Sequence, residues 1–262
     1  MNIHSFAVLA YSDSPYLAAC LESLKNQTVT SDIYISTSTP SEHIIALAKK
    51  YGVDLLITET GKGIAHDWNF SLQQAKTKYV TLAHQDDLYL PDYTASCISK
   101  AEQLKDNLIC FTNYAEIVAE LERSDTALLL IKRLLLWVNM PLKKNISSTS
   151  RKKVLCALGS PVATPSVMYN LENLSSFQFS PEFSVSIDWE AWYRMAGLKG
   201  RFVYLNQVLV QHRIHVNSAT TFGLKENKRA NEDLKMFKRY WPDFIARLLA
   251  WLYAKSYKSN DI

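Results

Sequence analysis

The sequence predicts an α/β protein built on a mostly parallel, Rossmann-like sheet flanked by helices, with a helical tail at its C-terminal end. Three observations support this prediction. Short apolar segments rich in β-formers alternate with helical segments of about a dozen residues. Polar side chains directly follow several of these segments, where open α/β sheets place their ligands. A basic amphipathic pattern then runs from about Leu224 to the end.

Length and composition narrow the possible classes. The 262 residues suffice for one large core or for a core with an appendage, and 48% hydrophobic with 21% charged residues is typical of a globular protein. A net charge of +4 without long basic runs gives no reason to expect a nucleic-acid partner. Four scattered cysteines without a C-x-x-C pair favour reduced thiols in a cytoplasmic protein. We find no secretory leader and no uninterrupted apolar run long enough to span a membrane.

The first third of the chain is a series of strand–helix units. We expect buried strands over residues 6–10, 32–36, 53–57 and 79–83. Ser14 and Pro15 suit the start of the first helix, and Thr39–Glu42 has capping-box spacing with proline at the first helical position. Gly52 would end that second helix, and the segment Thr60–Gly63 forms a flexible loop that opens the third.

The rest of the chain gives a less regular pattern. We expect a helix over 92–105, a strand over 108–112, an apolar helical region over 116–145, a basic helix over 147–158, a loop and strand over 161–169, a helix beginning near 186, and strands over 202–205 and 208–210. We find no internal repeat.

The strand at residues 79–83 ends in His84-Gln85-Asp86-Asp87. Adjacent carboxylates at a strand end repel each other, and a cation would relieve that repulsion. Hard divalent ions bind through one or two carboxylates together with phosphate oxygens of a substrate. The alternative is a solvated turn in which an aspartate caps the helix that follows. The two residues alone do not decide between these interpretations.

Taken in order, these pieces resemble glycosyltransferase family 2, the nucleotide-sugar-dependent inverting transferases of GT-A fold. The parts that carry the resemblance are Tyr11 after the first strand, a helix with Leu21, Ser23, Leu24 and Gln27, then Asn69 and Ala75, Asp86-Asp87 with Pro91, Asp188-Trp189 at a helix start, and Arg213-x-His215 with Ser218. The resemblance covers about residues 3–222. It implies a catalytic domain at 1–222 and a C-terminal helical extension at 223–262.

For the diphosphate side of the donor, the resemblance implies a divalent metal, Mn²⁺ or Mg²⁺. The Gln85-Asp86-Asp87 segment is similar to the family's D-x-D motif, with Gln85 in place of the first acid. Asp87 would then be the metal ligand, and Asp86 would contact the ribose or support the site from behind. Arg213 and His215 alternate along an extended segment and so face one side. The resemblance implies that this cationic pair holds the diphosphate, with His215 touching the metal.

For the nucleoside, the resemblance implies contacts near the first two strand ends. Tyr11, Ser36 and Thr37 stand where the family holds the base and the ribose. The family usually has an aspartate after the second strand, and Ser36-Thr37-Ser38 stands there in this chain. Lys62, between two glycines, would reach the base or a phosphate.

Asp188 matches the last acid of the family's E-D motif, whose first acid is replaced here by Ile187. The resemblance implies that Asp188 is the general base, which removes the proton of the acceptor hydroxyl as that oxygen attacks the anomeric carbon. The alternative interpretation of Asp188 is a helix N-terminal carboxylate favoured by the helix dipole.

The resemblance implies transfer of a sugar from a nucleoside diphosphate donor, with UDP favoured, to a glycan or lipid-linked acceptor in cell-surface polysaccharide or glycan biosynthesis. A second hypothesis is a non-catalytic protein of the same fold that binds nucleotide sugar or glycan. A glycosidase is a third, although two adjacent acids suit a metal better than flanking a glycosidic bond.

Two apolar stripes bear on where the protein acts. They cover Leu128–Trp137 and Phe244–Tyr253, with basic residues nearby: Lys132, Arg133, Lys143, Lys144, Arg247, Lys255 and Lys258. Helices of this kind can lie in a membrane interface. We expect a cytoplasmic enzyme loosely associated with the inner face of the membrane. The alternative is that both stripes pack on the domain or form a homodimer.

Overall fold

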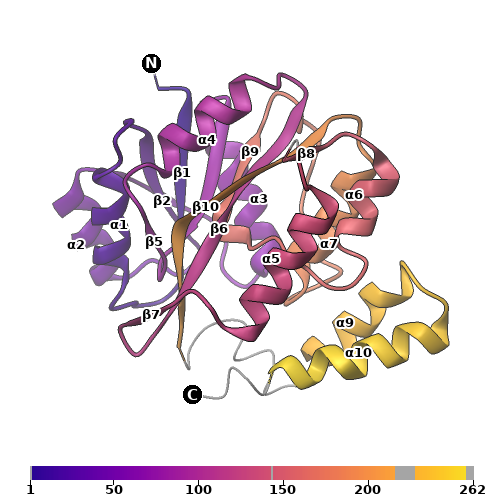
Figure 1. Ribbon diagram of the computed structural model, residues 1–262. Helices are drawn as coiled ribbons and strands as arrows, with labels where there is room; N and C mark the ends of the chain where they lie inside the picture. The colour runs from indigo at the N-terminus through magenta and orange to yellow at the C-terminus, as the bar shows by residue number, and fades with distance from the viewer. Residues whose placement is uncertain (1, 143, 216–227, 258–262) are drawn as a thin grey trace.

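One ten-stranded sheet runs through the computed structural model, which describes residues 2–142, 144–215 and 228–257 (Figure 1). Its main path has the strand order β3-β2-β1-β4-β9-β6-β10-β5, with β7 paired to β6 and β8 paired to β10. Along this path, only β9 and β5 run antiparallel to their neighbours. The prediction of a mostly parallel sheet flanked by helices is therefore confirmed. The described strands are β1 His4–Ala10, β2 Asp32–Thr37, β3 Asp54–Ile57, β4 Tyr79–His84, β5 Leu88–Tyr89, β6 Asn107–Val118, β7 Leu121–Arg123, β8 Asn145–Ile146, β9 Val167–Asn170 and β10 Arg201–Ile214.

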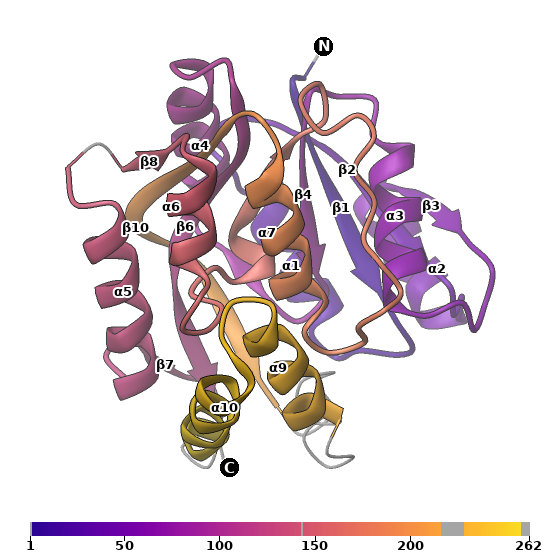
Figure 2. The same cartoon turned by 90° about the vertical axis from the view of Figure 1, so that its right-hand side faces the viewer.

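Helices cover both faces of this sheet (Figures 1 and 2). The described α-helices are α1 Leu17–Lys25, α2 Glu42–Tyr51, α3 Ile64–Gln74, α4 Tyr93–Glu102, α5 Ala127–Asn139, α6 Thr149–Leu155, α7 Ile187–Gly197, α9 Lys228–Lys238 and α10 Asp243–Tyr257, and a 3-10 turn, η1, spans Thr164–Ser166. Two separate clusters of buried apolar side chains lie between these helices and the sheet. The four cysteines are buried and free, as their spacing predicted.

The helix starts in the first third differ in detail from the prediction. α1 begins at Leu17, and the hydroxyl of Ser14 accepts from Tyr16 N–H at 3.3 Å instead of capping the helix from the expected position. α2 is capped by Ser41, whose hydroxyl accepts from Ile44 N–H at 3.3 Å. The N-cap therefore lies two residues beyond Thr39, and the predicted capping box does not form, because Ile44 stands where it needs a glutamate or glutamine. Gly52 ends α2 in a left-handed conformation, as expected.

The predicted helical region over 116–145 is wrong at its beginning. β6 continues through Val118, and a tight turn at Ala119 and Glu120, both at positive φ, leads into β7. β6 is buried at every position because strands and helices cover both its sides, so its sequence does not alternate between apolar and polar. The helical pattern that begins after Thr126 belongs to α5 alone. The prediction joins the end of β6, the strand β7 and the helix α5 into one helical region.

The two predicted strands near residue 205 form the single strand β10. It pairs with β6 in parallel along most of its length, with register shifts between Leu205 and Val210. These irregularities explain why the alternation of the sequence breaks in the middle of the strand. β10 carries Arg213 to the same edge of the sheet as the end of β4.

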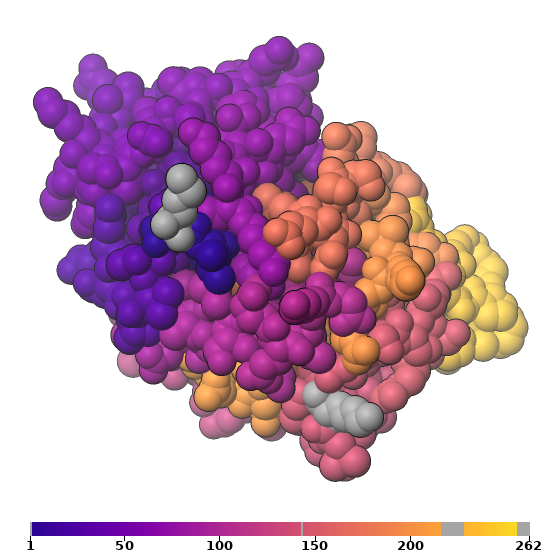
Figure 3. Space-filling view, turned by 90° about the horizontal axis from the view of Figure 1, so that it is seen from above, coloured from indigo at the N-terminus to yellow at the C-terminus, as the bar shows by residue number. Residues whose placement is uncertain are grey.

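The C-terminal helices α9 and α10 pack against α7 (Figure 2). The ring of Phe237 lies 4.9 Å from that of Trp189, and the indole of Trp241 donates to the Ala157 carbonyl at 2.7 Å. In the space-filling view the tail forms one side of the molecular surface (Figure 3). The expected boundary at residues 222 and 223 lies outside the described residues, as does Ser218. Among the described helices, none has the length and apolar character needed to cross a membrane.

Candidate active site

The residues expected to bind the donor gather at the edge where the parallel strands end. β1 has β2 on one side and β4 on the other, so the direction in which the chain builds the sheet reverses between β1 and β4. Open α/β sheets bind ligands at such a point, outside the carboxyl ends of the strands. Tyr11 directly follows β1, His84 ends β4, and Asp86 follows in the next turn. The fold therefore places these residues where a ligand crevice is expected.

Gln85 joins the ends of β1 and β4. Its side-chain oxygen accepts from Tyr11 N–H at 3.1 Å, and its amide nitrogen donates to the Tyr11 carbonyl at 2.9 Å. An amide can do both, whereas a carboxylate cannot donate to a carbonyl. The residue that replaces the expected first acid thus has a structural role in the crevice wall.

Asp87 is fully buried and joins the ends of β4 and β10. Its Oδ1 accepts from Arg213 N–H at 2.9 Å and pairs with His212 Nδ1 at 2.9 Å. Burial lowers the pKa of His212, but the charge of Asp87 and its hydrogen bond raise that pKa to about 9, so His212 is protonated at neutral pH. Oδ2 of Asp87 has no hydrogen-bond partner and lies 4.0 Å from His84 Nδ1. One oxygen of Asp87 thus remains available to a ligand.

Asp86 is the acid of this pair that reaches solvent, with 17% of its side chain exposed. Its Oδ2 lies 2.8 Å from His215 Nε2. Burial raises the pKa of Asp86, but the hydrogen bond from His215 and the nearby imidazoles outweigh it and hold that pKa below its usual value. Asp86 is therefore a carboxylate at neutral pH, in contact with the expected cationic partner from the end of β10.

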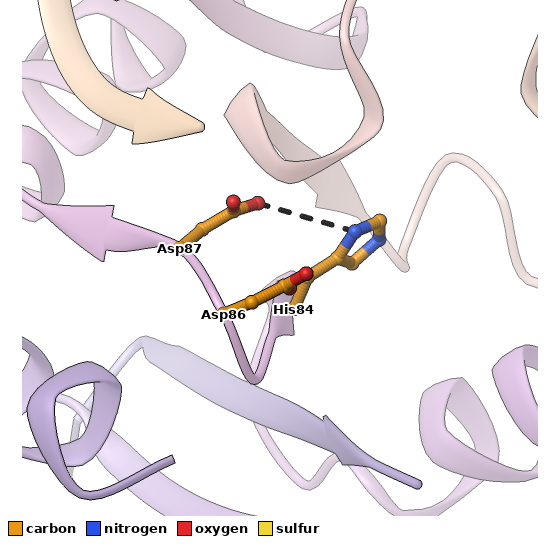
Figure 4. Close-up of side chains that lie close together, drawn as sticks. All are labelled: His84, Asp86 and Asp87. Carbon is orange, nitrogen blue, oxygen red and sulfur yellow. Dashed lines mark ion pairs between the residues drawn. The ribbon is translucent and has the colours of Figure 1, made fainter. Parts of the chain in front are cut away.

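His84, Asp86 and Asp87 each offer one ligand atom, and these three atoms lie within 4.8 Å of one another. Figure 4 shows the two carboxylates and the imidazole directed toward a common region beside the turn that follows β4. Two carboxylates suit a hard divalent cation. The unpartnered, buried Oδ2 of Asp87 fits the same interpretation, because such an oxygen is costly unless something binds it. The residues present therefore fit the expected metal.

Arg213 is held from several sides. Its backbone binds Asp87, its Nε donates to the Asp86 carbonyl at 3.2 Å, and its guanidinium lies 4.3 Å from the centre of the Tyr16 ring. Its Nη1 pairs with the carboxylate of Glu120, which comes from the β6–β7 turn and is 75% exposed. Glu120 thus occupies the anion-binding side of an otherwise buried arginine.

The expected nucleoside contacts differ in how accessible they are. Tyr11 is 63% exposed beside the crevice. Ser36 and Thr37 are buried, and their hydroxyls already bind Ser71 Oγ at 2.8 Å and Thr39 N–H at 3.0 Å. Lys62 is exposed and pairs with Glu59 on its own loop at 3.4 Å. The structure thus brings Asp86, Asp87, Arg213 and His215 together. In the described part of the chain, the polar side-chain contacts of Ser36, Thr37 and Lys62 are with residues outside that cluster.

Asp188 lies in the first turn of α7, at the end of the molecule toward which β1 points (Figure 2). Its Oδ1 accepts from Trp189 N–H at 2.7 Å. Burial raises the pKa of Asp188, and the nearby Arg229 and Lys132 only partly offset that effect. A carboxylate with a raised pKa is a stronger base, so this environment is compatible with the base role that the sequence predicted.

Several residues of the site were not predicted from the sequence. Asp67, in the first turn of α3, accepts from Ser38 Oγ at 2.9 Å at the end of β2, where the sequence lacks an acid. The one sequence feature that could have indicated Asp67 is its position in the first turn of a helix that follows a loop with two glycines. Glu120 and Tyr16 contact Arg213 through turns and packing that no sequence pattern indicates. His212 was not among the predicted site residues, and its hydrogen bond to Asp87 makes it part of the acidic cluster.

Comparison with known families decides the classification. The sequence model of glycosyl transferase family 2 matches residues 5–163, which is more than half of the chain and includes the strand end with Asp86 and Asp87. The chain belongs to glycosyl transferase family 2. The resemblance stated from the sequence is therefore confirmed, and so is the general class of glycosyltransferase.

The individual proteins that match this family 2 protein share little sequence identity with it. EpsH of Bacillus subtilis (strain 168), assigned to the glycosyltransferases, is 28% identical over 116 residues, which cover 42% of this chain and 33% of EpsH. The structure of S. aureus TarS 1–349 with UDP-GlcNAc matches with a TM-score of 0.59 at 13% identity, covering 94% of this chain and 70% of that one. The mannosyltransferase PcManGT from Pyrobaculum calidifontis, with GDP-Man and Mn²⁺, matches with a TM-score of 0.64 at 14% identity, covering 96% and 69%. At these identities the solved structures show a shared GT-A-type fold. The chain spans 42% of the longer TarS chain.

Proposed function

We propose that this protein is an inverting glycosyltransferase that moves a single sugar from a nucleoside diphosphate donor, preferably a UDP-sugar, to a glycan or lipid-linked acceptor. The observation that carries the proposal is the cluster of Asp86, Asp87, His212, Arg213 and His215 at the ends of β4 and β10. It combines carboxylates for a cation with cationic groups for an anion in one place. A nucleoside diphosphate bound with a divalent metal has this combination of charges.

The metal would be held by Asp86, by the unpartnered Oδ2 of Asp87 and by His84. His215 would act through Asp86, to which it is hydrogen-bonded, or exchange onto the metal. A bound Mn²⁺ or Mg²⁺ would neutralise the charge that develops on the departing diphosphate. Solved relatives contain UDP-GlcNAc, or GDP-Man with Mn²⁺, which supports a nucleotide-sugar donor without deciding between the two nucleotides.

Side chains of the protein would accept the acceptor's proton and stabilise the diphosphate. Asp188 would take the proton of the acceptor hydroxyl, because its buried setting raises its pKa and leaves one of its oxygens without the Trp189 contact. Protonated His212 and Arg213 place positive charge behind the diphosphate. Attack from the side opposite the leaving diphosphate would invert the anomeric centre.

The test is donor binding and turnover by the purified chain. We expect UDP-sugars to raise its thermal stability in the presence of Mn²⁺ or Mg²⁺ and not with EDTA, because a ligand that binds the native state stabilises it. We also expect slow release of UDP, accelerated by acceptor. Asp188→Asn should retain the thermal shift and lose turnover by about 10²- to 10⁴-fold. A thermal shift without any turnover in the wild type would instead support the binding-protein alternative.

The proposal also covers the acceptor and the cellular location of the enzyme. Synthesis of a cell-surface polysaccharide or glycan would place the enzyme in the cytoplasm at the inner face of the membrane. The exposed apolar sides of α5 and α10 support peripheral contact, with a homodimer as the alternative use of the same surface. In this proposal residues 1–222 form the catalytic unit, and residues 223–262 extend it.

A further inference from the structure

Two adjacent acids of the tail helix α9 bind the segment that leads into α7. The carboxylate of Glu232 accepts from Ser184 N–H at 2.9 Å, from Ser184 Oγ at 2.8 Å, from Val185 N–H at 2.9 Å and from Ser186 N–H at 2.8 Å. Asp233 accepts from Ser186 Oγ at 2.8 Å. Both acids are buried, and neither belongs to the acid–histidine cluster described above.

These contacts hold the residues that lead into the start of α7. Ser186 stands at the N-cap position of α7, and its own side chain makes no capping hydrogen bond to the helix. The backbone N–H groups at a helix start need acceptors, and the helix dipole favours a negative charge there. Glu232, 46 residues further along the chain, places a negative charge at this helix start and accepts from the N–H of Ser186, the N-cap residue. Burial raises the pKa of Glu232, but the three backbone hydrogen bonds outweigh it and hold that pKa below its usual value, so Glu232 binds as a carboxylate.

The segment that Glu232 holds leads directly to the candidate base. Asp188 follows Ser186 by two residues, and its Oδ1 binds the backbone of its own helical turn at Trp189. The position of its carboxylate therefore depends on how the first turn of α7 is held. The tail also fixes this turn from the side, because the Trp189 ring contacts Phe237 of α9 at 4.9 Å.

We propose that Glu232 is a positioning residue for Asp188, which makes the C-terminal tail part of the acceptor side of the active site. Glu232 holds the segment 184–186 through four hydrogen bonds and thereby fixes the direction in which the Asp188 carboxylate points. This inference rests on the proposed role of Asp188 as base. It adds a distinct requirement, which is that transfer, and not donor binding, depends on a buried acid of the tail.

Glu232→Gln is the direct test, because it preserves shape but removes the charge and turns one acceptor oxygen into a donor facing N–H groups. We expect its kcat for sugar transfer to fall by about 10- to 100-fold, since small displacements of a catalytic group have effects of this size. The Kd for UDP with Mn²⁺, measured by calorimetry, should stay within about twofold of wild type, because donor contacts lie on β1, β4 and β10.

Glu190→Gln is the matched control. Glu190 lies on α7 too, is buried, and links the helix to the tail through Arg239 at 3.1 Å and to Arg194 at 2.7 Å. In the described part of the chain, the hydrogen bonds of its carboxylate go to these two arginines and not to the segment 184–186. Its substitution should lower the melting temperature comparably while leaving kcat within about threefold of wild type, because a loss of stability alone does not redirect Asp188.

The kcat values of these variants decide whether Glu232 positions Asp188. Unchanged kcat in Glu232→Gln, or an equal loss in Glu190→Gln, would overturn the positioning role. If Glu232→Gln does not fold, Ser184→Ala removes one of the four hydrogen bonds to Glu232, the one from the Ser184 hydroxyl, and its kcat should fall by about three- to tenfold at constant donor Kd. Normal kcat in Ser184→Ala would then count against the proposal. Failure of the proposed function would be seen separately, as a wild-type protein that turns over no donor.

Discussion

Asp86 and Asp87 are neighbours in the chain but lie in different environments. Asp87 is fully buried against protonated His212 and the backbone of Arg213, whereas Asp86 reaches the crevice and pairs with His215. Removing one partner of a buried charged pair leaves the other charge uncompensated. The two acids should therefore respond differently to the same substitution.

Asp86→Asn and Asp87→Asn test this difference. We expect Asp86→Asn to abolish the Mn²⁺-dependent part of UDP binding while changing the free energy of unfolding by less than about 1 kcal/mol. Asp87→Asn should also lose metal-dependent binding, and in addition lose about 1.5–3 kcal/mol of stability, because the buried side chain loses its charge-assisted hydrogen bond to His212. Urea unfolding and calorimetry measure the two effects. Equal stability of both variants would show that the Asp87–His212 pair does not hold the two strand ends together.

If Arg213 binds the donor as proposed, Glu120 competes with the donor phosphate for its guanidinium. Its exposed carboxylate pairs with the guanidinium that the donor is proposed to contact. We expect Glu120→Ala to tighten UDP binding by about two- to fivefold, the range of a partly exposed ion pair. Glu122→Ala is the control, because Glu122 lies on the same hairpin and bonds to Gln211 instead. Weaker binding in Glu120→Ala would mean that Glu120 orients Arg213 for the donor.

At the scale of elements, the first four parallel strands were predictable because each is short, apolar and followed by a helix with its own end signals. The same reading of strands predicted that Asp86 follows a strand end. It also predicted that Arg213 and His215 face one side of an extended segment. The second part of β6 and its turn into β7 were not predictable, because a strand buried on both sides shows no alternation and the turn contains no glycine. Glu232 could not be assigned from the sequence, because its role depends on how the tail packs against α7.

β1 carries a testable pH dependence. His4 is fully buried between Ser31 at 2.8 Å and Thr81 at 3.0 Å, and burial lowers its pKa from 6.5 to about 3. The unfolded chain therefore binds a proton below about pH 6.5 that the native state does not bind. Stability should fall by about 1.4 kcal/mol per pH unit as the pH drops from 6.5 toward 3.

His4→Gln removes this titration and keeps a polar side chain. Between pH 7 and pH 5 the wild type should lose about 2 kcal/mol more than the variant, as followed by urea unfolding at each pH. The comparison cancels the contributions of other titrating groups. Parallel pH profiles for the two proteins would mean that His4 is protonated in the native state.

At the scale of the whole molecule, α5 and α10 come close to each other in both ribbon views (Figures 1 and 2). Both helices carry exposed large apolar side chains. We call this region the α5–α10 surface; its exposed residues are Leu130, Ile131, Leu134, Trp137, Val138, Phe244, Leu248, Trp251 and Leu252. Lys132 was expected beside it at the lipid headgroups, but its Nζ folds back to Tyr114 OH at 2.8 Å. Arg247 is 64% exposed, and the Lys255 ammonium lies 3.4 Å from the centre of the Trp251 ring. Lys143 and Lys258 lie outside the described residues.

The α5–α10 surface should bind vesicles that contain anionic lipid. Its aromatic and aliphatic side chains suit the membrane interface, and each basic residue near an anionic surface adds about 1 kcal/mol. We expect co-sedimentation at low salt and a smaller bound fraction at physiological salt, because the electrostatic part is screened. Trp137→Glu and Trp251→Glu should each weaken binding by about tenfold or more, since each loses the burial of one large apolar side chain.

Ile45→Glu provides the control, because Ile45 is 51% exposed on α2, away from the α5–α10 surface. Its vesicle binding should equal that of the wild type. Sedimentation of the free protein completes the experiment, because a second copy of the chain is the alternative partner for the same apolar side chains. A stable dimer that dissociates in Trp137→Glu, together with no vesicle binding at either salt, would assign this surface to self-association instead of to the membrane.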